Sequence, residues 1–173
     1  MTVNNKKLFI TVCFLFCIIT ASCGYRFAGS GDLPSGIDSV CIKILENKTG
    51  ETGVENILTN DIIYEFTRNK RKVLTHSNKA DAVLAGKIKS INIETISHKG
   101  EYTTLERRVR INLNLELTGR DKNILWTGKG ISDSETYYVA DDKMTTENNK
   151  RKAIEVLSKR LAEKTYNSLT DNF

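Results

Sequence analysis

A stretch of strict two-residue alternation near the middle of the chain constrains the fold more than any other feature. From Val109 to Thr118, every apolar side chain is followed by a polar one. Because successive side chains of a β-strand point to opposite faces, this period predicts a strand with one buried face and one wet face. A polar turn at residues 119–123 and a second strand at residues 124–131 follow. A tight turn between two long strands predicts that they pair antiparallel.

Two further strands are expected before this pair. Residues 39–45 are rich in apolar β-branched side chains, which is typical of a strand. A second strand unit starts near residues 73–74 and resumes at residues 81–93. Its apolar phase slips between Ile88 and Ile91, which predicts a β-bulge or a bend at that point.

Apolar residues spaced three and four apart predict two amphipathic helices, at about residues 53–68 and 145–172. Residues 132–144 are expected to form a polar loop before the second helix. The residues expected to cap that helix are Thr145, Asn148, Asn149 and the acid pair Asp141–Asp142. The element order β-α-β-β-β-α predicts an α+β fold, a two-layer sandwich. Two helices would pack on one face of a four-stranded, mostly antiparallel sheet.

The first 22 residues have the three parts of a secretory signal peptide. A positive start at Lys6 and Lys7 precedes an apolar run at residues 8–19. This run is shorter than the about 20 residues that span a bilayer, so we expect a cleaved signal peptide at residues 1–22 rather than a permanent transmembrane helix. Residues 23–36 are rich in Gly and Ser and are expected to form a tether, followed by a single domain at residues 37–173.

The sequence Thr20-Ala21-Ser22-Cys23 resembles a bacterial lipobox, whose cysteine receives a diacylglyceryl group and becomes the new N-terminus. Thr20 departs from the pattern, in which leucine is usual, and an ordinary cleaved signal with a chance cysteine is the alternative. The resemblance implies lipid attachment at Cys23. Each CH₂ of its acyl chains, palmitate among them, would contribute about 0.8 kcal/mol to membrane binding. Gly24, where an aspartate would retain the protein at the inner membrane, implies an outer-membrane destination.

The sequence has no recognisable catalytic or metal-binding motif. His76 and His98 lie in separate polar segments, without other ligands at metal-binding spacing. Cys41 lies in an apolar stretch and is expected to be a buried thiol. Without Lys6 and Lys7, the formal net charge falls from +5 to about +3, which gives no indication of a nucleic-acid partner. We therefore expect no enzyme and no cofactor, and an envelope hydrolase is the weakest alternative.

Several segments, in order along the chain, resemble the LPS-assembly lipoprotein LptE family. Residues 23–27 are similar to the family's lipidated opening. Residues 40–50 and 53–55 are similar to its first strand and the start of its first helix. Residues 80–88 resemble the start of its second strand, and residues 138–161 resemble its tail. The resemblance covers nearly the whole chain and implies two helices on a four-stranded sheet, in agreement with the pattern of the residues.

The resemblance also implies a function. Family members act as the plug subunit of the LptD β-barrel in the cell outer membrane, where they assist barrel assembly and the insertion of lipopolysaccharide into the outer leaflet. The implied partners are LptD, lipopolysaccharide and the outer membrane through the lipid anchor, with the domain facing the periplasm or the barrel lumen. The residues alone also fit a general envelope lipoprotein adaptor, such as a secretin-assembly pilot.

Basic residues on the strands are the candidate lipopolysaccharide contacts, because Lys and Arg bind phosphate groups. We expect them at strand faces and ends opposite the helix layer. The candidates are Lys87, Lys89, Arg107, Arg108 and Arg110, with Arg120 and Lys122 of the polar turn as a second group.

Overall fold

The computed structural model describes residues 33–34, 36–96 and 106–171. The expected signal peptide, the expected lipid attachment site Cys23 and most of the expected tether lie outside the described residues. The helices and strands are, in chain order, β1 (Ser39–Ile42), β2 (Glu46–Asn47), α2 (Val54–Arg68), β3 (Lys72–Leu74), β4 (Ala82–Ile96), β5 (Glu106–Gly119), β6 (Ile124–Tyr138) and α3 (Lys143–Thr170).

The described strands form one mixed sheet in the order β3-β1-β4-β5-β6, and β2 pairs with β4 further along the same edge. β1 runs parallel to β3 and β4, whereas the long strands β4, β5 and β6 pair antiparallel. The predicted count of four strands is wrong, because β2 and β3 add two short ones. The segments at residues 73–74 and 81–93 are separate strands, since Val73 pairs with Val40 of β1. Strands of two and three residues are too short to show a period in the sequence.

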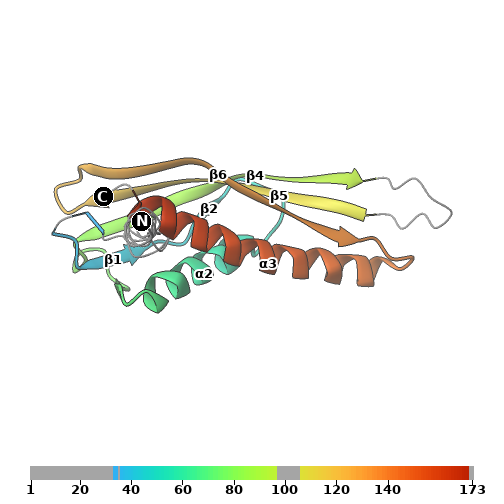
Figure 1. The fold of residues 1–173 in the computed structure, drawn as a ribbon, viewed down its shortest axis with the longest axis horizontal. Coiled ribbons are helices and arrows are strands. Elements are labelled where there is room, and N and C mark those ends of the chain that lie inside the picture. The colour runs from blue at the N-terminus through green and yellow to red at the C-terminus, as the bar shows by residue number, and fades with distance from the viewer. Residues whose placement is uncertain (1–32, 35, 97–105, 172–173) are drawn as a thin grey trace, which may run out of the picture.

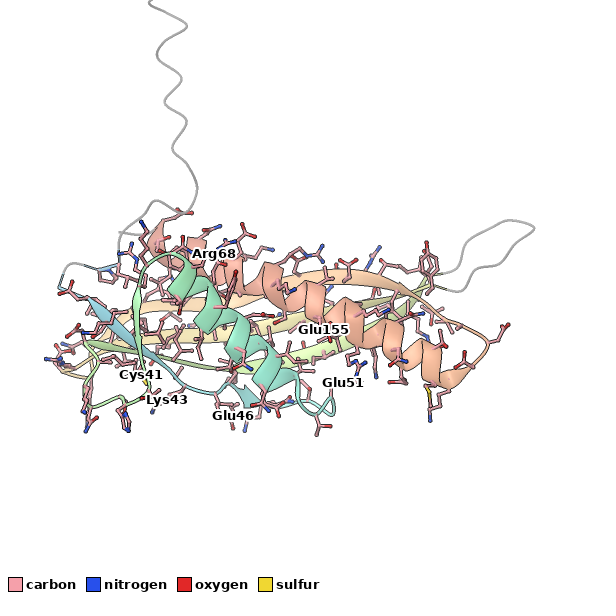
Figure 2. The ribbon with its side chains drawn as sticks, turned by 90° about the horizontal axis from the view of Figure 1, so that it is seen from below. Cys41, Lys43, Glu46, Glu51, Arg68 and Glu155 are labelled. Atoms are coloured by element: carbon pink, nitrogen blue, oxygen red, sulfur yellow. The ribbon has the colours of Figure 1, made fainter. Side chains whose placement is uncertain are left out.

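Both helices pack on one face of the sheet, as the sequence predicted (Figure 1). α2 contacts β1, β2 and β3, whereas α3 contacts β5 and β6. We call the end of the sheet at residues 119–123 the hairpin end, and the end where β4 stops at Ile96 and β5 starts at Glu106 the distal end. α3 has 28 residues and α2 has 15, so α3 alone extends toward the distal end (Figure 2).

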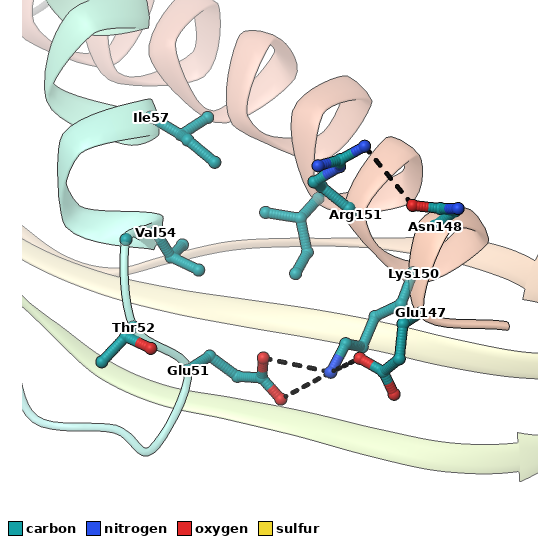
Figure 3. A pocket seen from close by; sticks show the side chains of 10 residues that line it. Glu51, Thr52, Val54, Ile57, Glu147, Asn148, Lys150 and Arg151 are labelled. Carbon is teal, nitrogen blue, oxygen red and sulfur yellow. Dashed lines mark hydrogen bonds and ion pairs between the residues drawn. The ribbon is translucent and has the colours of Figure 1, made fainter. Parts of the chain in front are cut away.

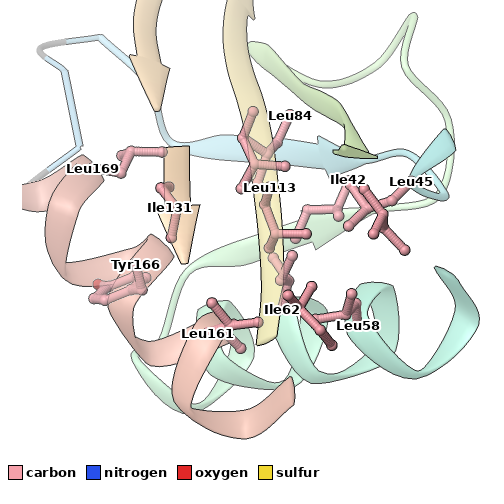
Figure 4. Close-up of a cluster of buried hydrophobic side chains, with 14 of the residues drawn as sticks. Ile42, Leu45, Leu58, Ile62, Leu84, Leu113, Ile131, Leu161, Tyr166 and Leu169 are labelled. Atoms are coloured by element: carbon pink, nitrogen blue, oxygen red, sulfur yellow. The ribbon is translucent and has the colours of Figure 1, made fainter. Parts of the chain in front are cut away.

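The alternating residues of β5 form the centre of the core. Val109, Ile111, Leu113 and Leu117 are fully buried. Side chains of both helices pack against this row, with those of Leu58 and Ile62 from α2 and of Leu161, Tyr166 and Leu169 from α3 shown in Figure 4. The rings of Phe66 and Tyr166 meet edge to face at 5.2 Å between centroids and join the two helices. Because full burial of one such side chain contributes about 1.5–3 kcal/mol, this row fixes which face of the sheet the helices cover.

A bulge in β4 and the turn between β5 and β6 lie where the sequence predicted them. The pairing of β4 with β5 shifts register between Ile88 and Ser90, which confirms the predicted bulge. The polar segment between β5 and β6 is a tight turn, closed by hydrogen bonds from the Lys122 amide to the Gly119 carbonyl and from the Gly119 amide to the Asn123 carbonyl. Lys122 adopts a left-handed conformation with φ of 64° in this turn.

The last strand is longer than the sequence predicted. β6 continues to Tyr138, so the loop expected at residues 132–144 is wrong over its first half. Asp133 and Glu135 point to the helix side of the sheet, opposite Ile111 and Val109, and both form ion pairs with Arg160 of α3. Two acidic residues on the helix side of a strand give a polar pattern that is typical of a loop.

The start of α3 is capped by Asp142. Its side chain accepts a hydrogen bond from the Thr145 amide at 2.7 Å. Hydrogen bonds from Thr145 also lower the pKa of the Asp142 carboxyl below its usual value. Of the residues expected to cap this helix, the acid pair therefore supplies the cap, and Thr145 donates to it.

Polar side chains of α3 cover the outer edge of β6. Three backbone carbonyls along this edge accept hydrogen bonds at 2.8–3.0 Å from helix side chains, namely Ser132 from Lys164, Ser134 from Arg160 and Tyr138 from Asn149. An uncovered strand edge invites pairing with another chain, so α3 protects this side of the sheet.

Candidate functional site

The face of the sheet opposite the helices is mostly polar, with apolar side chains at the hairpin end. The even-numbered residues of β5 point to this side, because the odd-numbered ones form the core. The cross-strand register places their neighbours on β4 and β6. We call this surface the outer face, and its polar residues are Lys87, Ser90, Asn92 and Glu94 of β4, Arg108, Arg110, Asn112, Asn114 and Glu116 of β5, and Thr127, Lys129, Ser132, Ser134 and Thr136 of β6.

A row of basic residues crosses the middle of the outer face. Asn114 pairs with Lys87 on one side and with Lys129 on the other. Since neighbouring strands lie about 4.8 Å apart, the two lysine backbones are about 10 Å apart. The Gly130 amide donates a hydrogen bond to Asn114 Oδ1 at 2.9 Å, which fixes the amide between the two lysines. The row therefore presents one lysine cation on each side of the Asn114 side-chain amide.

Two arginines of β5 continue the basic surface toward the distal end. Arg110 lies between Asn92 of β4 and Ser134 of β6, so no carboxylate is directly opposite it. Arg108 lies directly opposite Glu94, which partly balances its charge. Lys87, Lys129 and Arg110 are exposed to solvent. None of these three side chains forms an ion pair with another described residue, so they can bind an anion that approaches the outer face.

The structure separates two of the predicted candidates from this surface. Arg107 points to the helix side, where it lies beside Tyr137; the pKa of Glu147 of α3 is lowered mainly by its hydrogen bond with Lys150, and the charge of Arg107 adds to this effect. The expectation that it lies opposite the helix layer is therefore wrong. Lys89 is the extra residue of the β4 bulge and is exposed at the edge of the sheet.

Arg120 and Lys122 lie at the hairpin end. Gly119 lies eleven positions after Arg108 along β5, which corresponds to about 36 Å of strand. Arg120 forms an ion pair with Asp81 at 2.9 Å and donates to the Ala80 carbonyl at 3.1 Å. The pair joins the turn to the start of β4, so Arg120 has a structural role.

Asp81 is the centre of a small network at the hairpin end. Its Oδ2 accepts hydrogen bonds from the Ser39 hydroxyl at 2.7 Å and from the Ser39 amide at 2.9 Å. These hydrogen bonds, together with the charge of Arg120, lower the pKa of Asp81. The network ties the start of β1 to β4 and to the turn between β5 and β6.

Sequence reasoning missed Lys129, which completes the basic row. The pairing of β6 with β5 shifts register twice, on either side of the stretch from Trp126 to Lys129. These shifts interrupt the two-residue period, so the sequence gives no clear sign of which face Lys129 occupies. Lys129 lies between Gly128 and Gly130, and glycines within a strand are the sign of a bulge that the sequence offers here.

A cleft of about 290 Å³ lies on the helix side, between the start of α2 and the first turns of α3 (Figure 3). Lys150 of α3 lies at its floor and forms ion pairs with Glu51 at 3.1 Å and with Glu147 at 2.8 Å. Burial opposes the charge of Lys150, but hydrogen bonds to Glu147 and Glu51 raise its pKa above the usual value. The hydrogen bond with Lys150 lowers the pKa of Glu147. Both shifts move the pKa value further from 7, whereas a group that transfers protons at neutral pH needs a pKa near 7.

The described residues contain no group of three or more His, Cys, Asp or Glu side chains arranged to hold a metal ion. No helix among them combines the length and apolar character needed to span a membrane. Cys41 is 4% exposed and its thiol lies 3.8 Å from the Thr75 carbonyl, which confirms the predicted buried thiol.

Solved structures of bacterial lipoproteins have the same fold. Lipoprotein B from Nitrosomonas europaea matches with a TM-score of 0.55 and 14% identity over 86% of this chain and 92% of that chain. Rare lipoprotein B from Shewanella oneidensis matches with a TM-score of 0.54 and 13% identity over 78% and 95%. A minor lipoprotein from Acinetobacter baumannii matches with a TM-score of 0.51 and 16% identity over 80% and 95%. At these identities the likeness shows the fold alone.

No curated protein sequence matches this chain. The family model described as LptE, lipopolysaccharide-assembly, matches residues 37–169, which include every described strand, the whole of α2 and all but the last residue of α3. The protein therefore belongs to the LptE lipopolysaccharide-assembly family, whose members are lipoproteins without enzymatic activity.

Proposed function

We propose that this protein is the plug subunit of an LptD β-barrel translocon in the outer membrane. It assists assembly of the barrel and the insertion of lipopolysaccharide into the outer leaflet. Membership of the lipopolysaccharide-assembly family gives the process. The observation that carries the finer proposal is the outer face, a mostly polar sheet surface that no described helix or strand covers.

The dimensions of the sheet support this role. β4 and β6 each have 15 residues, which corresponds to about 50 Å of strand. This length exceeds the about 30 Å of a bilayer's hydrocarbon core. The lumen of a transmembrane β-barrel is polar, so hydroxyl, amide and guanidinium groups on the outer face match such a wall.

The basic residues of the outer face are the proposed lipopolysaccharide contact. Lys and Arg form charge-assisted hydrogen bonds with phosphate oxygens, and the charged groups here lie on three rigid strands. We assign the contact to Lys87, Arg108 and Arg110, with Lys129 added and Lys89 at the rim. Arg107 and the pair Arg120 and Lys122 belong to other surfaces and are expected to contribute less.

We propose the following arrangement for the rest of the chain. Residues 1–22 are a signal peptide, Cys23 carries the lipid, and residues 23–36 link it to the domain. The support from the structure is that β1 begins at the hairpin end, where Ser39 contacts Asp81. The membrane anchor would therefore connect to the end of the sheet opposite the distal end.

Purification in mild detergent tests the plug proposal. The full-length protein is tagged after Phe173 and isolated from its own outer membrane. Co-elution of a large β-barrel near a one-to-one ratio is expected. Recovery with a secretin ring would favour an adaptor role, and recovery of the lipoprotein alone would refute the plug proposal.

Charge reversal tests the proposed lipopolysaccharide contact. Replacing Lys87, Arg110 and Lys129 with Glu is expected to lower the affinity for lipopolysaccharide, measured with the purified protein by surface plasmon resonance. The charge-matched control replaces Lys143, Lys152 and Lys159, which are exposed on α3, with Glu and is expected to bind more tightly than the outer-face variant. Equal affinity of the triple variant and the control would contradict the assignment.

A further inference from the structure

The two edges of the sheet differ in how the rest of the chain covers them. The edge of β6 is covered by α3, whose side chains bind three of its carbonyls. The edge of β4 is covered by β1 at residues 82–84 and by β2 at residues 87–88. From Ser90 to Ile96, β4 pairs only with β5 in the part of the chain that the structure describes.

Backbone groups of β4 point out along this open stretch. Before the bulge, the carbonyls of Leu84 and Ile88 accept hydrogen bonds from the Lys43 and Lys48 amides on this edge. These two carbonyls belong to residues whose side chains face the helices. After the bulge the helix-side residues are Ile91, Ile93 and Thr95, so their amides and carbonyls point to the open edge. Seven residues of strand correspond to about 23 Å.

Ile93, in the middle of the open stretch, is only partly covered by the residues that the structure describes. Ile93 is on the core side of the sheet, opposite Val109, yet it is 40% exposed. Among the described residues, no strand pairs with this edge of β4 beyond Ile88, where the pairing with β2 ends. β1 and β2 thus form a row along β4 that stops short of the last part of the strand.

We propose that this open edge accepts a short extended segment of the barrel subunit, which adds a strand to the sheet beside residues 90–96. The inference rests on the proposed plug function and names the surface through which the two proteins join. Pairing of this kind gains affinity from backbone hydrogen bonds and specificity from alternate side chains. It would also cover Ile93.

The flanking side chains define the chemistry of the partner segment. On the helix side it lies next to Ile91 and Ile93 and therefore carries apolar residues at alternate positions. On the outer side it lies near Lys89 at one end and Glu94 at the other. An acidic residue near Lys89 and a basic residue near Glu94 complement these charges. At most about seven residues of the segment can pair with β4, because β2 occupies the edge beyond the open stretch. At a strand rise of about 3.3 Å per residue, this is the length of the open stretch.

A second copy of this chain fits the edge poorly. Antiparallel pairing of two β4 edges about Ile93 would place Ile96 of the copy opposite Ser90. Such pairing could not extend beyond these seven residues, because Glu46 and Asn47 of β2 already occupy the edge beside Lys87 and Ile88. A short segment that ends or turns away before β2 meets no such obstacle.

Edge variants of the full-length protein test the proposal, with the ratio of barrel to lipoprotein after mild-detergent purification as the measurement. Ile93→Pro removes an amide that points to the open edge and leaves the ladder with β5 intact. Ile93→Lys places a charge on the same edge. Val156→Lys is the matched control, because Val156 is also an exposed β-branched apolar residue, at 48%, but lies on α3, away from the open edge and from the outer face.

Both Ile93 variants are expected to lower the ratio at least about tenfold, which corresponds to about 1.4 kcal/mol. Val156→Lys is expected to keep the wild-type ratio, and all three variants are expected to melt close to the wild type. Wild-type ratios for both Ile93 variants would overturn the proposal, and if proline unfolds the domain, the lysine variant decides. Wild-type protein recovered without a barrel would instead refute the proposed function.

Cross-linking identifies the occupant of the edge. A photoreactive benzoylphenylalanine in place of Asn92, on the outer side of the open stretch, is expected to label one segment of the barrel. Peptide mapping should show alternating apolar residues in that segment. A cross-link to a second copy of this chain would overturn the proposal in favour of self-association.

Discussion

Gly86 of β4 offers a sharp test of how tightly the two central strands are held. A methyl group added at this position would lie 2.3 Å from the Asn114 carbonyl oxygen and 2.9 Å from the Leu115 Cα. Both atoms belong to the backbone of β5, so no side chain can rotate away. To reach even a 3.0 Å contact with the oxygen, the strands must separate by about 0.7 Å.

We expect Gly86→Ala to lower the free energy of unfolding by about 1–3 kcal/mol, the usual cost of overpacking a core. For a domain of this size the melting temperature would fall by about 3–10 °C. Lys87 follows Gly86 directly, so the same separation would displace it from Asn114 and Lys129. Affinity for lipopolysaccharide should therefore fall together with stability.

Thermal unfolding followed by circular dichroism measures the first effect. Gly50→Ala is the matched control, because a methyl group there meets no atom within 4 Å. The control is expected to melt at or slightly above the wild-type temperature, since alanine reduces the conformational entropy of the unfolded chain. If Gly86→Ala and Gly50→Ala melt together, the close approach of β4 and β5 at Gly86 does not constrain the sheet.

Three further outcomes are expected. Leu113→Ala, at a fully buried position of β5, should lower the free energy of unfolding by about 2–5 kcal/mol in chemical denaturation, and a loss below 1 kcal/mol would contradict the assigned core. The thiol of Cys41 should react with a maleimide only after denaturant is added, and rapid labelling of the native protein would show that it is not buried. Folding lowers the pKa values of four carboxyls, namely Glu55, Asp81, Asp142 and Glu147. The stability that they contribute is complete above their unfolded pKa values and is lost as the pH falls through their folded pKa values. The melting temperature should therefore be constant near neutral pH and fall only in acid, and a fall that begins above pH about 6 would contradict this assignment.

The features that the sequence predicted correctly are those that depend on a long, regular period. The alternation from Val109 to Thr118 predicted β5, its buried face and the uncovered polar face opposite the helices. The apolar spacing at three and four predicted α2 within one residue of its observed start. Burial on one face imposes such periods, and a long element repeats them often enough to be recognised.

The features that the sequence did not predict depend on contacts between distant residues. β3 has only three residues, and its partner β1 lies about thirty residues earlier, so no local pattern marks the pairing. The second half of β6 was expected to be a loop because Asp133 and Glu135 face the helix layer, where Arg160 of α3 balances their charge. That compensation is visible only once the last helix is packed in place.

The candidate contact residues show the same division. Arg107 and Arg108 are neighbours on a strand, so the two-residue period already requires them to point to opposite faces. Applying that period would have excluded Arg107 from the outer face. Lys129 could not be assigned in this way, because two register shifts interrupt β6 on either side of it.

The protection of β6 by α3 has a consequence for how the chain is made. Synthesis proceeds from the N-terminus, so the three antiparallel strands are complete before the first residue of α3 exists. Until Asn149, Arg160 and Lys164 arrive, the carbonyls of Ser132, Ser134 and Tyr138 are open to any other extended chain. A nascent protein that stops at Asp142 would therefore aggregate or be degraded, and the full-length protein is expected to depend on a chaperone until its C-terminal helix is released.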